Sequence, residues 1–596
     1  MQKLFEKNIQ FFYRHLPEYY KLISNIKQRN VQIKNDNLYF KGKPLYPNSI
    51  SHDSEILADI PTHNPHWKKD FFSLEPIYWE NDRFYITGKI INTLNNKAKS
   101  FDSYTKKGFI FDKDFMPTTT IFGLLAGKHL DILVKRHDFQ SLFVYEPNPE
   151  FFAVSLYFVD YPFIYEKLGE RFFLWVNGKI DYSSIERFYY ERVITSTFFS
   201  LSLKTYEHPL IEDAKNKFFE VNSAKIRGWG TYEDEIKGIK NHLKNITKHP
   251  LLSGSKQLNV PICIAANGKS LEQNIPFIKK NRESMILVSV GTALKPLLKA
   301  GITSDFHIEQ ERIDLLVDAL KDVLPNYEGY FVGASVVNPK VFEMAQKPLM
   351  YIREGFTFAS FYSPLFGASP IVGNAGVAFA SQFSKEIYLC GMDLGFRLNE
   401  KKHAKGSFYD SRDDVQKSGI KIEGNFSDDI YTDSLLLSSK KRLEFLIKTM
   451  KLNVYNLSDG AKIEGAVPLK DKTLPKIEKE KAINEIISCF KRTEKKEKNL
   501  NLHPILNAFS KSLNFENINS KKELTGRIDF LEDMTKKLEK KNPALGSLLR
   551  GSFWHILNNI YILAHKIDLK ELNKLVKPIK KELFLYEKDF NSAARD

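Results

Sequence analysis

The chain has 596 residues, of which 42% are hydrophobic and 27% charged, so it is long enough for more than one domain and too apolar to be disordered. Its formal net charge of +16 comes mostly from lysines spread along the chain, and this pattern does not predict nucleic-acid binding. Three scattered cysteines exclude a disulfide framework and a cysteine zinc site.

Residues 1–210 predict a smaller α/β domain. They open on a helical pattern that lacks the continuous apolar core of a signal peptide. No run in the chain approaches the ~20 apolar residues of a transmembrane helix, so we expect a cytoplasmic protein. Residues 119–160 predict strand, glycine turn, helix, strand and helix. An acid at such a strand end can bind a ribose hydroxyl, which leaves open a nucleoside site at Gly123, Gly127 and Glu146, although a non-catalytic domain is favoured.

Residues 211–470 predict a central domain with a Rossmann-like, mostly parallel sheet. A polar helical connector up to residue 250 is followed by apolar strands that alternate with helical patterns. The predicted strands are VPICIAA, SMILVSV, SDFHIE, GYFVGASV, LMYIRE, EIYLCGMD and LNVYNLS. Residues 471–596 are lysine-rich with apolar residues at helical spacing, and they predict a C-terminal helical domain.

The first of these strands runs into the turn Asn267–Ser270, which resembles half of a phosphate-binding P-loop. A complete loop would need glycine at position 263, where the chain has Cys263. Pro276 argues against a helix that begins at Ser270, and we expect Asn274 to cap a helix with this proline in its first turn. The turn remains either a ligand contact through Asn267, Gly268 and Ser270 or an ordinary Asx-type turn.

Other strand ends carry polar or glycine-rich turns. The pair Gly291–Thr292 opens a helix whose N-terminus favours an anion. Asp305, His307 and Glu309 alternate along one strand face, which fits either ligand contact or an exposed edge strand. We also expect ligand contacts from three residues ahead of a small-residue helix and from an acid that ends the next strand: Gly373, Asn374, Gly376 and Asp393.

The polar loop 397–410 follows the strand that ends at Asp393. Its cationic side chains could close over phosphates, and His403 titrates near neutral pH. A surface loop with an incidental histidine is the other interpretation of this segment. The candidate side chains in the loop are Lys401, Lys402, His403, Lys405 and Tyr409.

Five segments, in this order, resemble the motility accessory factors, a family of flagellin glycosyltransferases, and more distantly the bacterial sialyltransferases. They are IAANGKSL, GITSDFHIE, NAGVAFASQFSKEIYLCGMDLGF, KKHAKGSFYD and LEFLIKTMKLNVYNLSDGAKIEG. The resemblance implies transfer of a nonulosonic acid, of pseudaminic or legionaminic type, from its CMP-activated form to Ser or Thr of flagellin. Such a modification would be needed for flagellar assembly and motility. The alternatives are another nucleotide-dependent enzyme, of pyrophosphokinase type, and a non-catalytic flagellin-binding chaperone.

The resemblance also implies roles for the candidate residues. The donor nucleotide and sugar would contact Asn267, Gly268, Ser270, Gly291, Thr292, Glu309, Gly373, Asn374 and Gly376, while Lys402 and Tyr409 would neutralise the leaving phosphate. Sialyltransferases have a histidine shortly before the LEFL-type helix, and this chain has none there. The base is therefore open between His403 and either Asp433 or Tyr431, with Asp393 as a further catalytic candidate. No D-x-D triplet occurs in the central domain, so we expect neither a metal nor a cofactor besides the donor.

Overall fold

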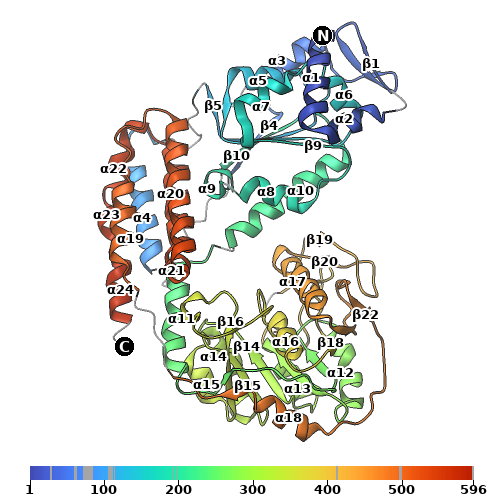
Figure 1. Ribbon diagram of the computed structural model, residues 1–596, viewed down its shortest axis with the longest axis vertical. Helices are drawn as coiled ribbons and strands as arrows, with labels where there is room; N and C mark the ends of the chain where they lie inside the picture. Colours follow the sequence, from blue (N-terminus) through green and yellow to red (C-terminus); the bar gives the residue numbers. More distant parts are fainter. Residues whose placement is uncertain are drawn as a thin grey trace. The chain divides into compact units, whose positions relative to one another are not determined.

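The structure is a computed structural model, and it describes residues 1–26, 30–59, 64–71, 85–104, 112, 114–190, 192–197, 199–227, 229–410, 414–494 and 500–593. The chain forms two compact units, which are described separately (Figure 1). The first comprises Met1–Glu233 and Asn501–Asp589, and the second comprises Asp234–Leu500 and Phe590–Asp596. The expected α/β architecture with a helical C-terminal region is confirmed.

The first unit contains a five-stranded sheet in the order β4-β10-β6-β8-β9. Only β4 is antiparallel to its neighbour. The strands are β4 (Trp67–Phe71), β10 (Phe199–Lys204), β6 (Thr118–Phe122), β8 (Leu142–Glu146) and β9 (Phe172–Val176). One face packs on α1 (Gln2–His15), α5 (Lys128–Arg136), α6 (Pro149–Ser155) and α7 (Tyr161–Leu168), and the other on α8 (Tyr182–Tyr190) and α10 (Pro209–Arg227). Alternate side chains of β8 point to opposite faces, so both faces are apolar.

The N-terminal end of this unit holds smaller elements. The helix α2 (Pro17–Ser24) follows α1 after a break at Leu16, where Pro17 starts a new helix. A three-stranded antiparallel sheet of β1 (Val31–Lys34), β2 (Asn37–Phe40) and β3 (Lys43–Pro44) comes next, and then α3 (Ile50–Ala58). The short pair β5 (Phe115–Met116) and β7 (Asp138–Phe139), and the helix α9 (Val193–Thr197), complete the α/β part.

Glu146 ends β8 as predicted, but its carboxylate is used within the protein. It accepts hydrogen bonds from the Leu124 and Asn148 main-chain nitrogens, at 2.6 and 2.8 Å, and from the Tyr206 hydroxyl at 2.6 Å. Burial raises the pKa of Glu146 to about 7, and these hydrogen bonds oppose the rise. The carboxylate thus stabilises the loops that surround it, a structural role.

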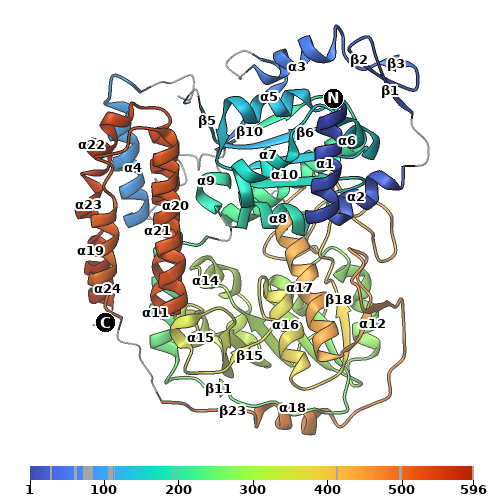
Figure 2. The same ribbon diagram turned by 45° about the horizontal axis from the view of Figure 1, so that its top comes forward.

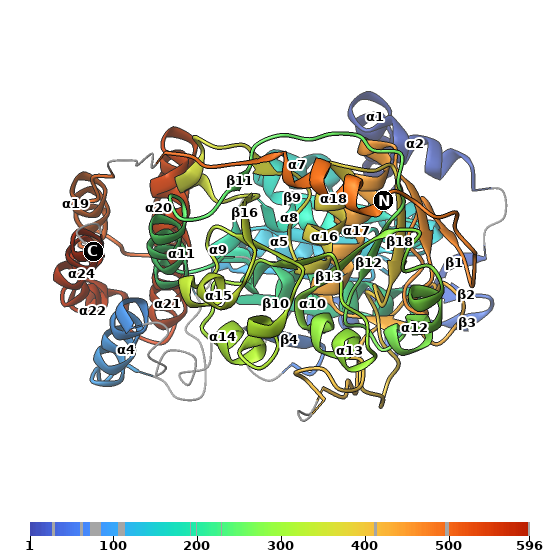
Figure 3. The ribbon, with the colours of Figure 1, turned by 90° about the horizontal axis from the view of Figure 1, so that it is seen from below.

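The helical part of the first unit combines segments from both ends of the chain. Figure 3 shows α4 beside helices of the C-terminal region. These helices are α4 (Tyr85–Lys99), α19 (His503–Ser512), α20 (Lys521–Lys541), α21 (Pro543–Ala564), α22 (Leu572–Val576), α23 (Ile579–Glu582) and α24 (Leu585–Ala593). Buried hydrogen bonds join α4 to the bundle: Thr87 Oγ1 lies 2.7 Å from Ser552 Oγ and 2.9 Å from the Tyr586 hydroxyl.

The second unit is built on an eleven-stranded sheet, of which Figure 2 shows the region around β15 and β18. The strand β17 branches from β16. The order of the others is β22-β21-β18-β12-β13-β14-β15-β16-β11-β23. All neighbours are parallel except β11 and β23. The strands are β11 (Leu251–Leu252), β12 (Ile262–Ala265), β13 (Ile286–Val290), β14 (Phe306–Glu309), β15 (Tyr330–Ala334), β16 (Pro348–Arg353), β17 (Pro364–Leu365), β18 (Glu386–Cys390), β21 (Asn453–Asn456), β22 (Ala466–Pro468) and β23 (Phe490–Lys491). All seven predicted strands are therefore confirmed.

The order in which these strands follow one another reverses next to β12. The chain passes from β12 through β13, β14 and β15 to β16 in one direction, and then places β18, β21 and β22 on the other side of β12. The gap between β12 and β18 is therefore the topological switch point of the sheet. In open α/β sheets, ligands bind at the carboxyl ends of the strands at such a point.

Helices cover both faces of the sheet at the switch point. The helices α12 (Leu271–Lys280) and α13 (Leu294–Lys299) pack on the face that includes Cys263 and Leu287. The helix α16 (Val372–Ser381) covers the other face, where a side chain on Gly376 would lie 2.5 Å from Val290 Cγ1. The helix α17 (Ser434–Met450) packs on α16. Cys263 and Cys390 are buried free thiols, as predicted.

The remaining elements of the second unit are short, apart from its first helix. They are α11 (Tyr232–Asn245), α14 (Leu315–Leu320), α15 (Pro339–Met344), α18 (Lys479–Ile487), and the two-stranded pair β19 (Ile420–Lys421) and β20 (Tyr431–Thr432). The predicted domain boundaries at residues 210 and 470 differ from the edges of the compact units. The helix α10 packs on the first sheet across residue 210, and residues beyond 470 supply β23, which pairs with β11.

Two local predictions are wrong. The helix after the β12 turn begins at Leu271 and contains Pro276. Asn274 lies within this helix and does not cap it, because its side chain bonds two neighbouring loops. The Asn274 side chain accepts from the Gly391 main-chain nitrogen and donates to the Leu457 carbonyl, both at 2.9 Å. The strand that carries His307 is central, since β14 pairs with both β13 and β15, so the edge-strand interpretation fails.

Candidate active site

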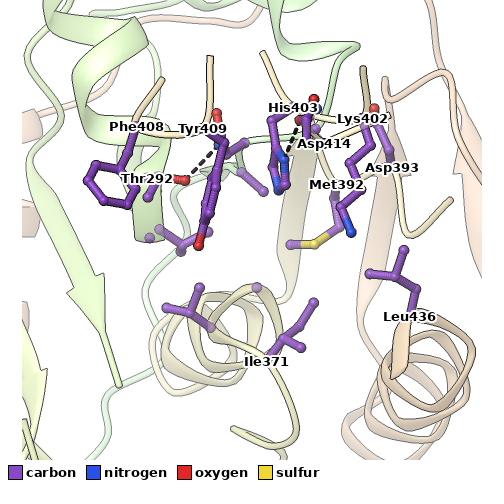
Figure 4. Close-up of a pocket in the computed structure, with 18 of the residues that line it drawn as sticks. Thr292, Ile371, Met392, Asp393, Lys402, His403, Phe408, Tyr409, Asp414 and Leu436 are labelled. Atoms are coloured by element: carbon purple, nitrogen blue, oxygen red, sulfur yellow. Dashed lines mark hydrogen bonds and ion pairs between the residues drawn. The ribbon is translucent and has the colours of Figure 1, made fainter. Parts of the chain in front are cut away.

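A cavity of about 670 Å³ lies at the carboxyl ends of β12, β13, β14 and β18 (Figure 4). Its floor follows the switch point, and its sides are formed by residues within 402–409, by Asp414 and Gln416, and by the first residues of α16 and α17. Ten of the predicted site residues line this cavity: Asn267, Gly268, Gly291, Thr292, Glu309, Gly373, Asp393, Lys402, His403 and Tyr409. Residues far apart in sequence thus meet at the position where sheets of this kind bind ligands.

The turn after β12 forms one wall of the cavity. The Asn267 side chain donates to Thr292 Oγ1 at 2.6 Å, while its Oδ1 atom is buried and has no hydrogen-bond partner among the described residues. Gly268 permits a close backbone approach, because a side chain there would lie 2.4 Å from Asp393 Cγ. The turn therefore places an acceptor beside the cavity.

Asp393 fixes the start of α12 as well as lining the cavity. Its carboxylate accepts from the Ser270 main-chain nitrogen at 3.0 Å and from the Ser270 hydroxyl. Burial raises the pKa of Asp393 to about 6, although the Ser270 hydrogen bonds oppose the rise. Ser270 does not line the cavity and acts as a partner of Asp393.

Loop 402–404 pairs with the β12 turn. The Lys269 main-chain nitrogen donates to the Lys402 carbonyl at 3.0 Å, and the Ala404 nitrogen donates to the Asn267 carbonyl at 3.1 Å. These backbone bonds place His403 opposite Gly268. The predicted polar loop is therefore anchored at the switch point and is not an incidental surface segment.

His403 carries the most reactive arrangement in the cavity. Its Nδ1 atom lies 2.8 Å from Asp414 Oδ2, and its ring stacks on Tyr409 with centroids 4.5 Å apart. Figure 4 shows both rings extending into the cavity toward the end of the helix beside Ile371. Because Asp414 accepts from Nδ1, the Nε2 atom is the ring nitrogen available to a substrate. Burial lowers the pKa of His403, opposed by its hydrogen bond to Asp414.

The N-terminus of α16 faces the same space. Ile371, Val372 and Gly373 line the cavity, and no side chain among the described residues caps the helix. Its first free main-chain N–H groups can therefore bind an anion, which the helix dipole also favours. Lys402 adds a cation to the cavity.

Three further predicted site residues, two donor contacts and one candidate base, do not line the cavity. Asn374 and Gly376 lie within α16 instead of before it, because the helix begins at Val372. The Asn374 amide bonds the Ser439 carbonyl and hydroxyl on α17, while Gly376 allows α16 to pack closely on β13. Asp433 caps α17 by accepting from the Leu435 and Leu436 nitrogens, both at 2.9 Å, and it does not line the cavity.

Sequence reasoning missed Asp414, the partner of His403. A histidine followed eleven residues later by an acid is a weak signal, and only the folded loop brings the two together. It also missed the apolar side chains of the cavity wall, which include Met392, Leu435 and Leu436. Among the described residues, no group of three or more His, Cys, Asp or Glu is placed to hold a metal ion, and no helix could cross a membrane.

Taken together, the cavity offers an anion site, a cation and an oriented imidazole. This combination suits transfer of a group from an anionic leaving group to a nucleophile that must lose a proton. Residues 4–226 match the family model of the glycosyltransferase Maf N-terminal domain. Residues 236–399 match the model of 6-hydroxymethylpterin diphosphokinase MptE-like proteins.

A solved structure, the MAf glycosyltransferase from Magnetospirillum magneticum AMB-1, has the same fold. It is similar over 99% of this chain and 97% of its own, with a TM-score of 0.68 and 20% sequence identity. No curated protein matches the chain significantly. The N-terminal family model and the shared fold support a glycosyltransferase. The resemblance to the motility accessory factors (Maf) is confirmed: residues 4–226 match the Maf N-terminal domain, and the chain shares the fold of a Maf glycosyltransferase. The likeness to sialyltransferases stays a prediction.

Proposed function

We propose that this protein transfers a nonulosonic acid, of pseudaminic or legionaminic type, from its CMP-activated form to Ser or Thr hydroxyls of flagellin. One observation carries the proposal: the oriented His403 imidazole and the N-terminus of α16 face one cavity at the switch point of the sheet. The first can accept a proton and the second can hold a phosphate. O-glycosyl transfer from a sugar–phosphate donor needs both.

The proposed donor would bind in the cavity in one orientation. Its phosphate would lie at the N–H groups of Val372 and Gly373, with the Lys402 ammonium group as counter-charge. The nucleoside would lie along the strand ends, where Asn267 offers a carbonyl oxygen that no described residue occupies. The sugar would then lie between the phosphate and the His403 ring.

The reaction balances without a further reagent. The bond between the anomeric carbon and the phosphate oxygen breaks, and its electron pair leaves with CMP. The acceptor hydroxyl oxygen bonds the anomeric carbon, and its proton passes to His403 Nε2. The transition state has oxocarbenium character, so charge grows on the phosphate, and the helix amides and Lys402 stabilise it. Because the hydroxyl proton is lost late, a base as weak as imidazole is sufficient.

Calorimetry of the full chain with CMP, ATP and S-adenosylmethionine tests the donor class. We expect CMP to bind and the Asn267→Ala variant to bind it about tenfold more weakly, because one buried hydrogen bond is lost. The variant should still capture flagellin. Binding of ATP alone would reject the CMP donor.

A second function is supported by the family model matched by residues 236–399. In that case the same cavity would transfer a diphosphate from a nucleoside triphosphate to an alcohol. The two functions are separated by the product, since glycosyl transfer releases CMP and diphosphate transfer releases AMP. A protein that binds flagellin but releases neither product would instead be a chaperone.

A further inference from the structure

A chain of buried polar side chains runs from the cavity wall into the interior of the sheet. Glu309 lines the cavity, and its Oε1 atom lies 3.5 Å from His307 Nε2. His307 Nδ1 lies 2.9 Å from Ser289 Oγ, which lies 2.7 Å from Ser304 Oγ. The chain ends at the Tyr327 hydroxyl, 3.0 Å from both Ser304 Oγ and the Ser304 carbonyl. All of these side chains are buried, so the proton positions along the network depend on one another.

The hydrogen bonds of this chain can run in either direction. If the Tyr327 hydroxyl donates to Ser304 Oγ, each hydroxyl donates to the next and His307 Nδ1 accepts. His307 Nε2 then carries the proton and faces an ionised Glu309. If the Tyr327 hydroxyl donates to the Ser304 carbonyl, each bond reverses and Nε2 becomes an acceptor facing a protonated Glu309. The buried chain therefore accommodates both protonation states of the Glu309 carboxyl group.

These two states limit what Glu309 can bind. Burial raises the pKa of Glu309, which makes the protonated state accessible. In both states the carboxyl oxygen turned away from His307 accepts hydrogen bonds, because the proton of the protonated state lies between Glu309 and His307. A phosphate is repelled by the ionised state, and an ammonium group has no charge partner in the protonated state. A neutral donor such as a sugar hydroxyl suits both states.

We propose that Glu309 is a specificity-determining residue that binds a hydroxyl group of the bound nucleotide sugar, and that His307 is its positioning residue. The proposal rests on the proposed function only in taking the ligand to be a nucleotide or its sugar. The Asn267 Oδ1 atom, which no described residue pairs, belongs to the same wall, since Asn267 bonds Thr292 at the end of β13 and β13 neighbours β14. Neighbouring strands lie about 4.8 Å apart, a spacing that one sugar ring can bridge.

The hydroxyl has two sources, the ribose and the transferred sugar, and calorimetry distinguishes them. The ligands are CMP, 2′-deoxy-CMP, 3′-deoxy-CMP, ATP with its 2′- and 3′-deoxy forms, and CMP-N-acetylneuraminic acid. The full-length variants are Glu309→Ala, Glu309→Gln, His307→Phe and, as a control, Asp318→Asn, which removes an exposed carboxylate of the same unit. Thermal unfolding reports whether each variant folds, and Glu309→Gln preserves the shape of the side chain if Glu309→Ala does not fold.

We expect Glu309→Ala to weaken binding about tenfold, which is one hydrogen bond to a charged group. If Glu309 binds a ribose hydroxyl, wild type should bind one of the two deoxy-CMP ligands tenfold more weakly than CMP. Glu309→Ala should not weaken the binding of that deoxy-CMP any further. If Glu309 binds a hydroxyl of the transferred sugar, Glu309→Ala should leave the affinity for CMP unchanged and lower the affinity for CMP-N-acetylneuraminic acid tenfold. His307→Phe should lose at least threefold for the same ligand only, and Glu309→Gln less than threefold.

Three results would overturn the inference. The first is a Glu309→Ala affinity within twofold of wild type for every ligand. The second is a Glu309→Ala loss of more than twofold for CMP or ATP that is equally large for both deoxy forms of that nucleotide. The third is a wild-type protein that binds none of the ligands. His307→Phe without effect would reject the positioning role. A protein that binds ATP but not CMP, with the loss pattern above on ATP and a deoxy form, would reject the CMP donor and retain the role of Glu309.

Discussion

A single carboxylate oxygen of Asp414 bonds both the ring and the main chain of His403. The Asp414 Oδ2 atom lies 2.8 Å from His403 Nδ1 and 3.2 Å from the His403 main-chain nitrogen. The imidazole is therefore fixed in one orientation and one tautomer, with Nε2 turned to the cavity. This is the geometry that a general base needs before its substrate arrives.

We predict that His403→Ala lowers the rate of glycosyl transfer by about 10²–10⁴-fold, the usual contribution of a general base. Donor affinity should change much less, because the proposal places the donor phosphate at the N-terminus of α16 and beside Lys402. Asp414→Asn should cause a smaller loss of rate, since the ring remains but its orientation is less fixed. Single-turnover rates at saturating donor measure both effects. A His403→Ala rate equal to that of wild type would remove this residue from the mechanism.

The pH dependence of the rate follows from the lowered pKa of His403. A base acts when it is unprotonated, so the rate should be full above this pKa and should fall only below the ordinary histidine value of 6.5. Asp414 raises the pKa of His403, so Asp414→Asn should move the acid limb to still lower pH. The same shift reduces stability as pH falls below 6.5, since the unfolded chain binds that proton more readily. A rate that declines already between pH 8 and 7 would contradict the assignment.

The raised pKa of Asp393 predicts that the free energy of unfolding changes with pH in the direction opposite to that given by His403. Its pKa in the folded protein is raised from 3.8 to about 6, so the folded state binds the proton more tightly than the unfolded state does. The contribution of this proton is present below pH 3.8 and is lost as pH rises through about 6. An asparagine side chain does not titrate, so Asp393→Asn should gain about 2.4 kcal/mol in unfolding free energy relative to wild type between pH 4 and pH 8. Denaturant unfolding at both pH values measures it, and an unchanged difference would show that Asp393 is not titrating there.

The turn after β12 gives a paired prediction. Lys269 forms an exposed ion pair with Glu272, so Lys269→Ala should cost less than about 1 kcal/mol and leave donor affinity unchanged. Gly268→Ala should destabilise by about 1–3 kcal/mol and weaken donor binding, because its side chain would lie 2.6 Å from the Gly391 carbonyl oxygen. Thermal unfolding and calorimetry report both changes. A donor affinity that depends on Lys269 would support a P-loop and contradict the site described above.

Much of the fold could be predicted because its strands are short apolar runs ended by glycine or polar turns. These signals are local, and they also located Asn267, Thr292 and Asp393 at the ends of parallel strands. Where each helix begins was harder to predict. Asn374 and Gly376 look like a loop, yet their contacts with Ser439 and Val290 place them inside α16.

Partners supplied by distant parts of the chain could not be predicted. Nothing near Ser270 indicates that its helix is capped from Asp393, 123 residues later. Likewise, no periodicity shows that α4 packs on α21, because helical patterns specify an apolar face and not the surface it covers. The division into two compact units follows from such long-range contacts, and the predicted boundaries at 210 and 470 differ from it for that reason.

The most direct test is the intact mass of flagellin co-expressed with this protein and a supply of CMP-nonulosonic acid. The proposal predicts a mass increase by whole nonulosonic acid residues, located on Ser or Thr, that is lost with His403→Ala and retained with Lys269→Ala. Flagellin of unchanged mass in the presence of the folded wild-type protein and its donor would contradict it.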